Sequence, residues 1–127
     1  MMLLLDTCAL LWLVNGGGQL TYSAREAIDT ALIVYVSAIS GFEISLKYHK
    51  GKLGLPCEPH EWFKLAVEHH DLSILSLDID ICIASTELPP FHKDPCDRFI
   101  IATAKIHNLP IVTADPTFQN YGVTILS

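Results

Sequence analysis

Positive charge is scarce in this sequence. Its 127 residues include 8 Lys and Arg against 14 Asp and Glu, so the net charge is −6 at pH 7. There is no basic tail and no run of Lys or Arg, which excludes nucleic-acid binding through bulk charge. An RNA ligand would need a bound cation to change the local field. Half of the residues are hydrophobic, which suffices for one core.

Motifs for disulfide frameworks, zinc sites and membrane insertion are also missing. The 4 cysteines form no CxxC pair, so we expect reduced, buried thiols in a cytoplasmic protein. The 6 histidines are scattered, and the sequence predicts no histidine-based metal site. The apolar start at 1–5 is too short for a signal peptide and stops at Asp6. No apolar run approaches the length of a membrane span.

Two kinds of apolar pattern alternate along the chain. Short runs rich in Leu, Ile and Val predict strands at 2–5, 32–36, 72–77, 111–113 and 123–126. Helical periodicity, caps and prolines predict helices at 8–14, 23–31, 37–48, 59–70, 79–88 and 95–107. The alternation predicts one α/β domain over residues 1–127 with a mainly parallel sheet of about four to five strands between layers of helices.

The stretch from 92 to 115 places two acids around the last predicted helix. Asp94 is a suitable N-cap and Pro95 suits the first helical position, so Asp97 falls in the first turn. Asp115 follows the predicted strand at 111–113. Ligands of α/β sheets gather outside the carboxyl ends of the strands, so Asp97 and Asp115 are expected to share one crevice.

Two further acids point to the same edge. Asp6 closes the first strand, although it would also serve as an ordinary helix N-cap. Glu43 is expected at the margin of a buried stripe formed by Ile39, Phe42 and Leu46, where it either faces solvent or leans over the carboxyl edge of the sheet.

Two other local patterns carry separate predictions. Asp78 and Asp80 resemble a DxD metal pair, but acids in the first turn of a helix explain them more simply. Ser23 and Glu26 match a capping box, which would begin the second helix at Ser23.

Four carboxylates in one crevice repel one another, and a divalent cation removes that conflict. Oxygen ligands without His or Cys select Mg²⁺ or Mn²⁺ over zinc or copper. One such ion lowers the pKa of a bound water, and a second would stabilise the leaving oxygen of an in-line displacement.

Four motifs together resemble the PIN domain and, more narrowly, the VapC-like ribonuclease toxins of bacterial toxin–antitoxin pairs. They are LLLDT at 3–7, SAISGFEISLK at 37–47, HKDPCDRFIIATA at 92–104 and TAD at 113–115. They occur in the family's order and spacing, and the resemblance covers nearly the whole chain. It implies a PIN-like three-layer α/β/α fold and a quartet of acidic metal-binding and catalytic residues at Asp6, Glu43, Asp97 and Asp115.

The resemblance also implies supporting residues. They are Thr7, Asp94, Arg98 and Thr113. We interpret Asp94 mainly as the helix cap. Arg98 would either contact phosphate or pair with a nearby acid. Two positions depart from the family's usual pattern, since Cys96 stands where Phe is common and Phe42 where Trp is common.

The implied activity is that of a Mg²⁺- or Mn²⁺-dependent endoribonuclease that leaves a 5′-phosphate and acts as a toxin. The implied partners are an RNA substrate, a second copy of the chain and a small DNA-binding antitoxin that inserts a basic residue into the site. A receiver-like phospho-acceptor domain is an alternative, but it needs adjacent acids where this chain has Asp6, Thr7 and Cys8. A catalytically silent PIN-like binding module is another, against which the four retained acids argue.

Overall fold

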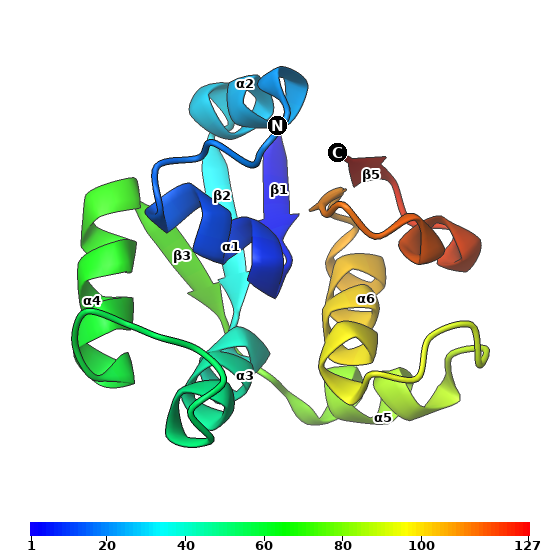
Figure 1. The fold of residues 1–127 in the computed structure, drawn as a ribbon. Helices are drawn as coiled ribbons and strands as arrows, with labels where there is room; N and C mark the ends of the chain where they lie inside the picture. The colour runs from blue at the N-terminus through cyan, green and yellow to red at the C-terminus, as the bar shows by residue number, and fades with distance from the viewer.

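Five parallel strands form one sheet in the computed structural model, which describes residues 1–127. The strands are β1 (Met2–Leu5), β2 (Ile33–Ser37), β3 (Leu72–Leu75), β4 (Ile111–Val112) and β5 (Ile125–Leu126). Their order is β3-β2-β1-β4-β5, and every neighbouring pair is parallel (Figure 1). β1 is central, with Leu4 paired to Tyr35 on one side and to Ile111 on the other.

Helices cover both faces of this sheet (Figure 1). They are α1 (Thr7–Val14), α2 (Tyr22–Thr30), α3 (Ala38–His49), α4 (Pro59–His70), α5 (Ile79–Glu87), α6 (Pro95–His107) and the 3-10 helix η1 (Pro116–Tyr121). The expected α/β class and mainly parallel sheet between helical layers are confirmed.

The central strand divides the core in two, because successive side chains of a strand point to opposite faces. Leu3 and Leu5 pack with α1, α2 and α4 in one cluster, whereas Leu4 packs with α6 and η1 in the other. All three leucines are fully buried. α3 joins the layers, since Ile44 belongs to the first cluster and Ile39 to the second.

The predicted helices at 59–70 and 95–107 are confirmed to the residue. The predicted strands at 72–77 and 123–126 are shorter in the structure, and both lie at edges of the sheet. β3 pairs only with β2 and stops where β2 ends, at Leu75 opposite Ser37. β5 pairs only with the two residues of β4. An edge strand therefore takes its length from its single neighbour.

The predicted buried stripe of α3 is confirmed for Ile39 and wrong for Phe42 and Leu46. Phe42 is 56% exposed and Leu46 40%, whereas Ile39, Glu43 and Ile44 are buried. α3 follows β2 directly and lies beyond its arrowhead (Figure 1), so the face that meets the protein is the one that crosses the end of the sheet. Glu43 lies on that face, at its centre and not at its margin.

The predicted capping box is also wrong. The hydroxyl of Thr21 accepts the hydrogen bond from the backbone N–H of Ala24, and α2 begins at Tyr22. Thr21 also donates a hydrogen bond to the carbonyl of Ser127. None of the helices combines the length and the apolar character that crossing a membrane requires.

The two candidate caps of α2 can be separated by mutation. Thr21→Ala should lower the free energy of unfolding by about 1 kcal/mol, because an N-cap hydrogen bond is lost. Ser23→Ala is the matched control and should change it by less than about 0.5 kcal/mol, because Ser23 is exposed and caps nothing. Urea unfolding measures both, and equal losses would contradict the assignment.

Candidate metal centre at the carboxyl edge of the sheet

Asp6 follows β1 directly and has two roles. Its Oδ1 accepts a hydrogen bond of 2.8 Å from the N–H of Ala9, so it is the N-cap of α1. It is only 6% exposed, and burial raises the pKa of its carboxyl. Hydrogen bonds from Thr113 and Ala9 oppose that rise, while the charges of Glu43 and Asp115 add to it. The helix cap is therefore also a member of a carboxylate cluster.

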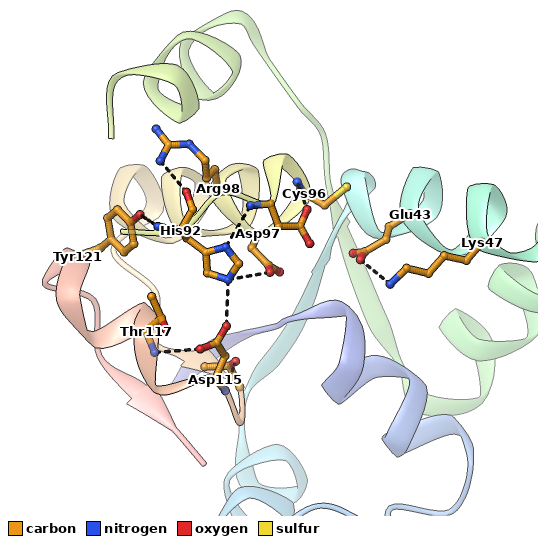
Figure 2. Close-up of polar contacts among 11 residues, drawn as sticks. Glu43, Lys47, His92, Cys96, Asp97, Arg98, Asp115, Thr117 and Tyr121 are labelled. Carbon is orange, nitrogen blue, oxygen red and sulfur yellow. Dashed lines mark hydrogen bonds and ion pairs between the residues drawn. The ribbon is translucent and has the colours of Figure 1, made fainter. Parts of the chain in front are cut away.

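Glu43 projects from the buried face of α3 toward the same region (Figure 2). Its Oε2 lies 3.0 Å from Nζ of Lys47, one helical turn further on. Its Oε1 is buried and has no hydrogen-bond partner. The hydroxyls of Thr7 and Ser40 lie 2.9 Å apart and join the first turn of α1 to α3. Thr7 thus fixes the helix that carries Glu43 against the end of β1.

Asp97 lies in the first turn of α6 and faces the other acids. Its pKa is raised to about 7, first by burial and then by the charge of Asp94, with further contributions from Glu43 and Asp6 and opposition from His92. The coupling to Glu43 and Asp6 shows that three of the predicted acids lie within electrostatic reach of one another. The raised pKa means that the folded protein disfavours the ionised form of Asp97 unless a positive charge compensates it.

Asp115 follows β4 and completes the group. Its Oδ1 accepts a hydrogen bond of 2.9 Å from the N–H of Thr117, and its own N–H donates to the hydroxyl of Thr113. Desolvation acts to raise the pKa of this carboxyl, but the hydrogen bonds from Thr117 and His92 outweigh it, and the pKa is lowered. Asp115 is therefore the readily ionised member of the cluster.

His92 is a site residue that sequence reasoning missed. Its Nε2 lies 3.0 Å from Asp97 Oδ2 and 2.9 Å from Asp115 Oδ2, so the imidazole stands between the two carboxylates (Figure 2). The ligand atoms of these three residues all lie within 4.8 Å of one another. The only signal for His92 in the sequence is its place in the loop just before the capped start of α6.

The supporting residues Asp94 and Arg98 have structural roles. Asp94 caps α6 by accepting a hydrogen bond of 2.9 Å from the N–H of Cys96. Arg98 was expected to contact phosphate or to pair with an acid, and the structure supports neither. Its guanidinium donates to four backbone carbonyls, those of Ser85, Leu88, Pro89 and His92. It thus ties the loop between α5 and α6 to α6.

The competing acidic pair lies outside the cluster. Asp78 accepts a hydrogen bond of 2.9 Å from the N–H of Ile81 and caps α5, while Asp80 is an exposed acid in the first turn. Neither is among the causes of the pKa shifts of Asp6, Asp97 and Asp115. The interpretation of both as ordinary first-turn acids is confirmed.

A family model matches most of the chain. The model of the PIN domain matches residues 3–123 of the chain. The chain belongs to the PIN-domain family. The match begins in β1, just before Asp6, and extends past Asp115, so it includes every element that holds the site.

Individual relatives match the chain over most of their length. The chain is 29% identical over 119 residues to "Ribonuclease VapC22" of Mycobacterium tuberculosis, which covers 93% of this chain and 90% of that protein. VapBC2 from Rickettsia felis, solved bound to a promoter DNA fragment, superposes with a TM-score of 0.72 at 17% identity, over 99% of this chain and 98% of that one. FitAcB from Neisseria gonorrhoeae gives 0.69 at 23% identity, over 100% and 97%.

The donor set of this PIN domain fits a hard divalent cation. Asp6, Glu43, Asp97 and Asp115 offer only carboxylate oxygens, which suits Mg²⁺ or Mn²⁺. Glu43 Oε1 is a buried carboxylate oxygen without a partner, and such an atom is costly unless something satisfies it. These four residues are the ones that would hold the ion.

The raised pKa of Asp97 predicts how the metal-free protein responds to pH. In the unfolded chain this carboxyl titrates near 3.8, and in the folded protein at about 7. Between these values the unfolded state releases a proton that the native state keeps, so the free energy of unfolding falls as pH rises. Asp97→Asn removes this contribution. In urea unfolding with EDTA at about pH 5 and about pH 8, wild type should lose more stability than the variant.

Added Mn²⁺ provides the control for that measurement. At about pH 8 it should raise the melting temperature of the wild type more than that of Asp97→Asn, because it binds the ionised native site. An identical pH dependence in the two proteins would contradict the shifted titration of Asp97.

Proposed function

We propose that this PIN domain is a Mg²⁺- or Mn²⁺-dependent endoribonuclease and the toxin of a toxin–antitoxin pair. The observation that carries the proposal is the convergence of four acids from β1, α3, α6 and the end of β4, one of them with an unpartnered buried oxygen. The name of the M. tuberculosis relative, a ribonuclease, supports the reaction.

The proposed catalytic and metal-binding residues are Asp6, Glu43, Asp97 and Asp115. The chemistry that a bound ion supplies is a water of lowered pKa and neutralisation of charge on the phosphodiester. The four acids would themselves supply the oxygen donors to the ion. As the resemblance to VapC-like ribonucleases implies, hydrolysis would leave a 5′-phosphate. The net charge of −6 then fits an RNA substrate, because the substrate meets the metal and not the acids directly.

The supporting residues act by holding this arrangement. Thr7 joins α1 to α3, Thr113 accepts from the N–H of Asp115 and hydrogen-bonds to Asp6, and Asp94 starts α6 in the orientation that presents Asp97. Arg98 fixes the loop before that helix. None of them needs to touch RNA to affect cleavage.

Of the two alternative functions, the comparison with known families excludes one and an experiment must test the other. A receiver-like phospho-acceptor domain is excluded by membership of the PIN family. A catalytically silent PIN-like module would have no reason to gather four acids at one edge with two of them, Asp6 and Glu43, buried at a cost in solvation. The cleavage assay below tests this alternative.

An antitoxin partner follows from the neighbours. The solved VapBC complexes, from Rickettsia felis and from Salmonella typhimurium, were each determined with DNA. We infer for this chain a small DNA-binding antitoxin whose basic residue enters the acidic site. A pocket of about 120 Å³ lined in part by Ala9, Trp12, Thr113 and Ala114 lies beside the acids and would accept an apolar side chain next to that basic residue.

The remaining inferences concern the assembly and its place in the cell. Exposed Phe42, Leu46, Ile79 and Ile83 on α3 and α5 support a homodimer, because a second copy would cover them. A toxin that cleaves its host's RNA would act in the cytoplasm.

The acid quartet is tested against an acid outside it. Asp97→Asn keeps the size of the side chain but removes a charged donor, so cleavage of single-stranded RNA in Mn²⁺ should fall at least about 100-fold. Asp80→Asn, also in the first turn of a helix, should remain within about threefold of wild type, since surface substitutions away from a site have small effects. A Mn²⁺-independent cleavage, or greater sensitivity at Asp80, would refute the assignment.

Inhibition by the antitoxin should compete with the metal. An arginine bridges two carboxylates with paired hydrogen bonds and would occupy the same four acids. The apparent affinity for a C-terminal antitoxin peptide, measured by fluorescence anisotropy, should weaken as Mn²⁺ rises. A peptide with that Arg changed to Ala should inhibit poorly. Inhibition that ignores both changes would place the partner's action away from the acids.

A further inference from the structure

The imidazole of His92 contacts the carboxylates of two acids that come from different elements. Asp97 comes from the first turn of α6 and Asp115 from the end of β4, and Nε2 of His92 lies within 3.0 Å of an oxygen of each. The contact to Asp115 is a hydrogen bond. Asp97 has no other hydrogen-bonding or ionic partner for its carboxylate. The relative position of the two acids therefore depends on this imidazole.

The other ring nitrogen fixes the role of the first. Nδ1 of His92 lies 3.2 Å from the backbone N–H of Asp94 and accepts a hydrogen bond from it. Accepting requires a lone pair on Nδ1, so the ring proton is on Nε2. The Nε2–H group therefore donates to Oδ2 of Asp115, and Nε2 also lies 3.0 Å from Oδ2 of Asp97. If His92 were a metal ligand through Nε2, that nitrogen would need the lone pair and the ring proton would move to Nδ1. The Nδ1–H would then face the N–H of Asp94, and the hydrogen bond from Asp94 would be lost.

The loop that carries His92 is itself fixed from several sides. Arg98 donates to the carbonyl of His92, and the hydroxyl of Tyr121 accepts from the N–H of His92 (Figure 2). The same hydroxyl donates to the carbonyl of Pro89. The imidazole packs edge-on against the fully buried ring of Phe118, with ring centroids 5.7 Å apart. These contacts fix the position of the imidazole, and therefore the position of Nε2 relative to Asp97 and Asp115.

We propose that His92 is a positioning residue: its Nε2–H, held by the N–H of Asp94, sets the separation and orientation of Asp97 and Asp115 for metal binding without itself ligating the metal. This inference rests on the proposed function, because it assigns the two acids to the metal site. It gives the loop contacts of Arg98 and Tyr121 a purpose, which is to deliver one N–H group to the gap between two like charges.

Three substitutions separate this role from simple packing. In His92→Gln the side-chain amide nitrogen lies as many bonds from Cβ as Nε2 does, so the donor is retained. In His92→Asn the side-chain amide ends at the position of Nδ1, so it can still accept from Asp94 but cannot reach the carboxylates. Tyr121→Phe loosens the loop and leaves the imidazole in place.

The first measurement is Mn²⁺ affinity of each full-length variant by electron paramagnetic resonance, with melting temperature as the check on folding. His92→Asn should weaken Mn²⁺ binding and lower kcat/KM about 10- to 100-fold, the usual cost of losing a partner of a metal ligand. His92→Gln should restore both to within about threefold of wild type, and Tyr121→Phe should show a smaller loss. Equal losses in the Gln and Asn variants with unchanged melting temperatures would overturn the proposal.

The second measurement tests direct ligation. Electron spin-echo modulation of bound Mn²⁺ should show no coupling to an imidazole nitrogen in the wild type. A nitrogen coupling that disappears in His92→Gln would make His92 a ligand and overturn the proposal. If wild type binds Mn²⁺ but cleaves no RNA, the proposed function fails while the affinities still decide the role of His92.

Discussion

The mutual repulsion of four carboxylates is the constraint on which this structure depends. Parallel strands and the helices that follow them bring Asp6, Glu43, Asp97 and Asp115 to one edge of the sheet, where solvent is partly excluded. Low-dielectric surroundings strengthen the repulsion. The pKa of Asp97 is raised to about 7 first by burial and then by the charge of Asp94, and the charges of Glu43 and Asp6 add to the rise. A fold that keeps such a cluster needs rigid support for each acid and a compensating group for its charge.

Backbone geometry supplies most of the support. Asp6 and Asp115 each accept a hydrogen bond from a backbone N–H near the start of the helix that follows, and Asp97 lies in the first turn of α6. The positive end of a helix dipole favours a negative charge at these positions. The carboxyl ends of β1 and β4 therefore hold acids that local structure already stabilises. The same local caps leave the other carboxylate oxygens directed at the crevice.

Side chains around the cluster supply the rest. Lys47 neutralises one oxygen of Glu43 but leaves Oε1 unsatisfied, and His92 lies between Asp97 and Asp115. Asp6 and Asp115 accept hydrogen bonds and Asp97 lies against His92, whereas Oε1 of Glu43 is buried without a hydrogen-bond partner. The unpartnered oxygen of Glu43 is the atom that a bound cation would satisfy in the metal-dependent site that we propose.

The sequence by itself determined the strand and helix alternation, the parallel sheet and the edge at which the four acids lie. These features follow from short-range rules: apolar runs, caps at Asp6 and Asp94, and Pro95 at the start of α6. Only the tertiary structure decided which face of α3 is buried, because that face depends on how the helix crosses the end of the sheet. It also decided the place of His92 and the partners of Arg98. Both depend on a loop fixed by Tyr121, 29 residues beyond His92, and no local pattern records a contact between such distant residues.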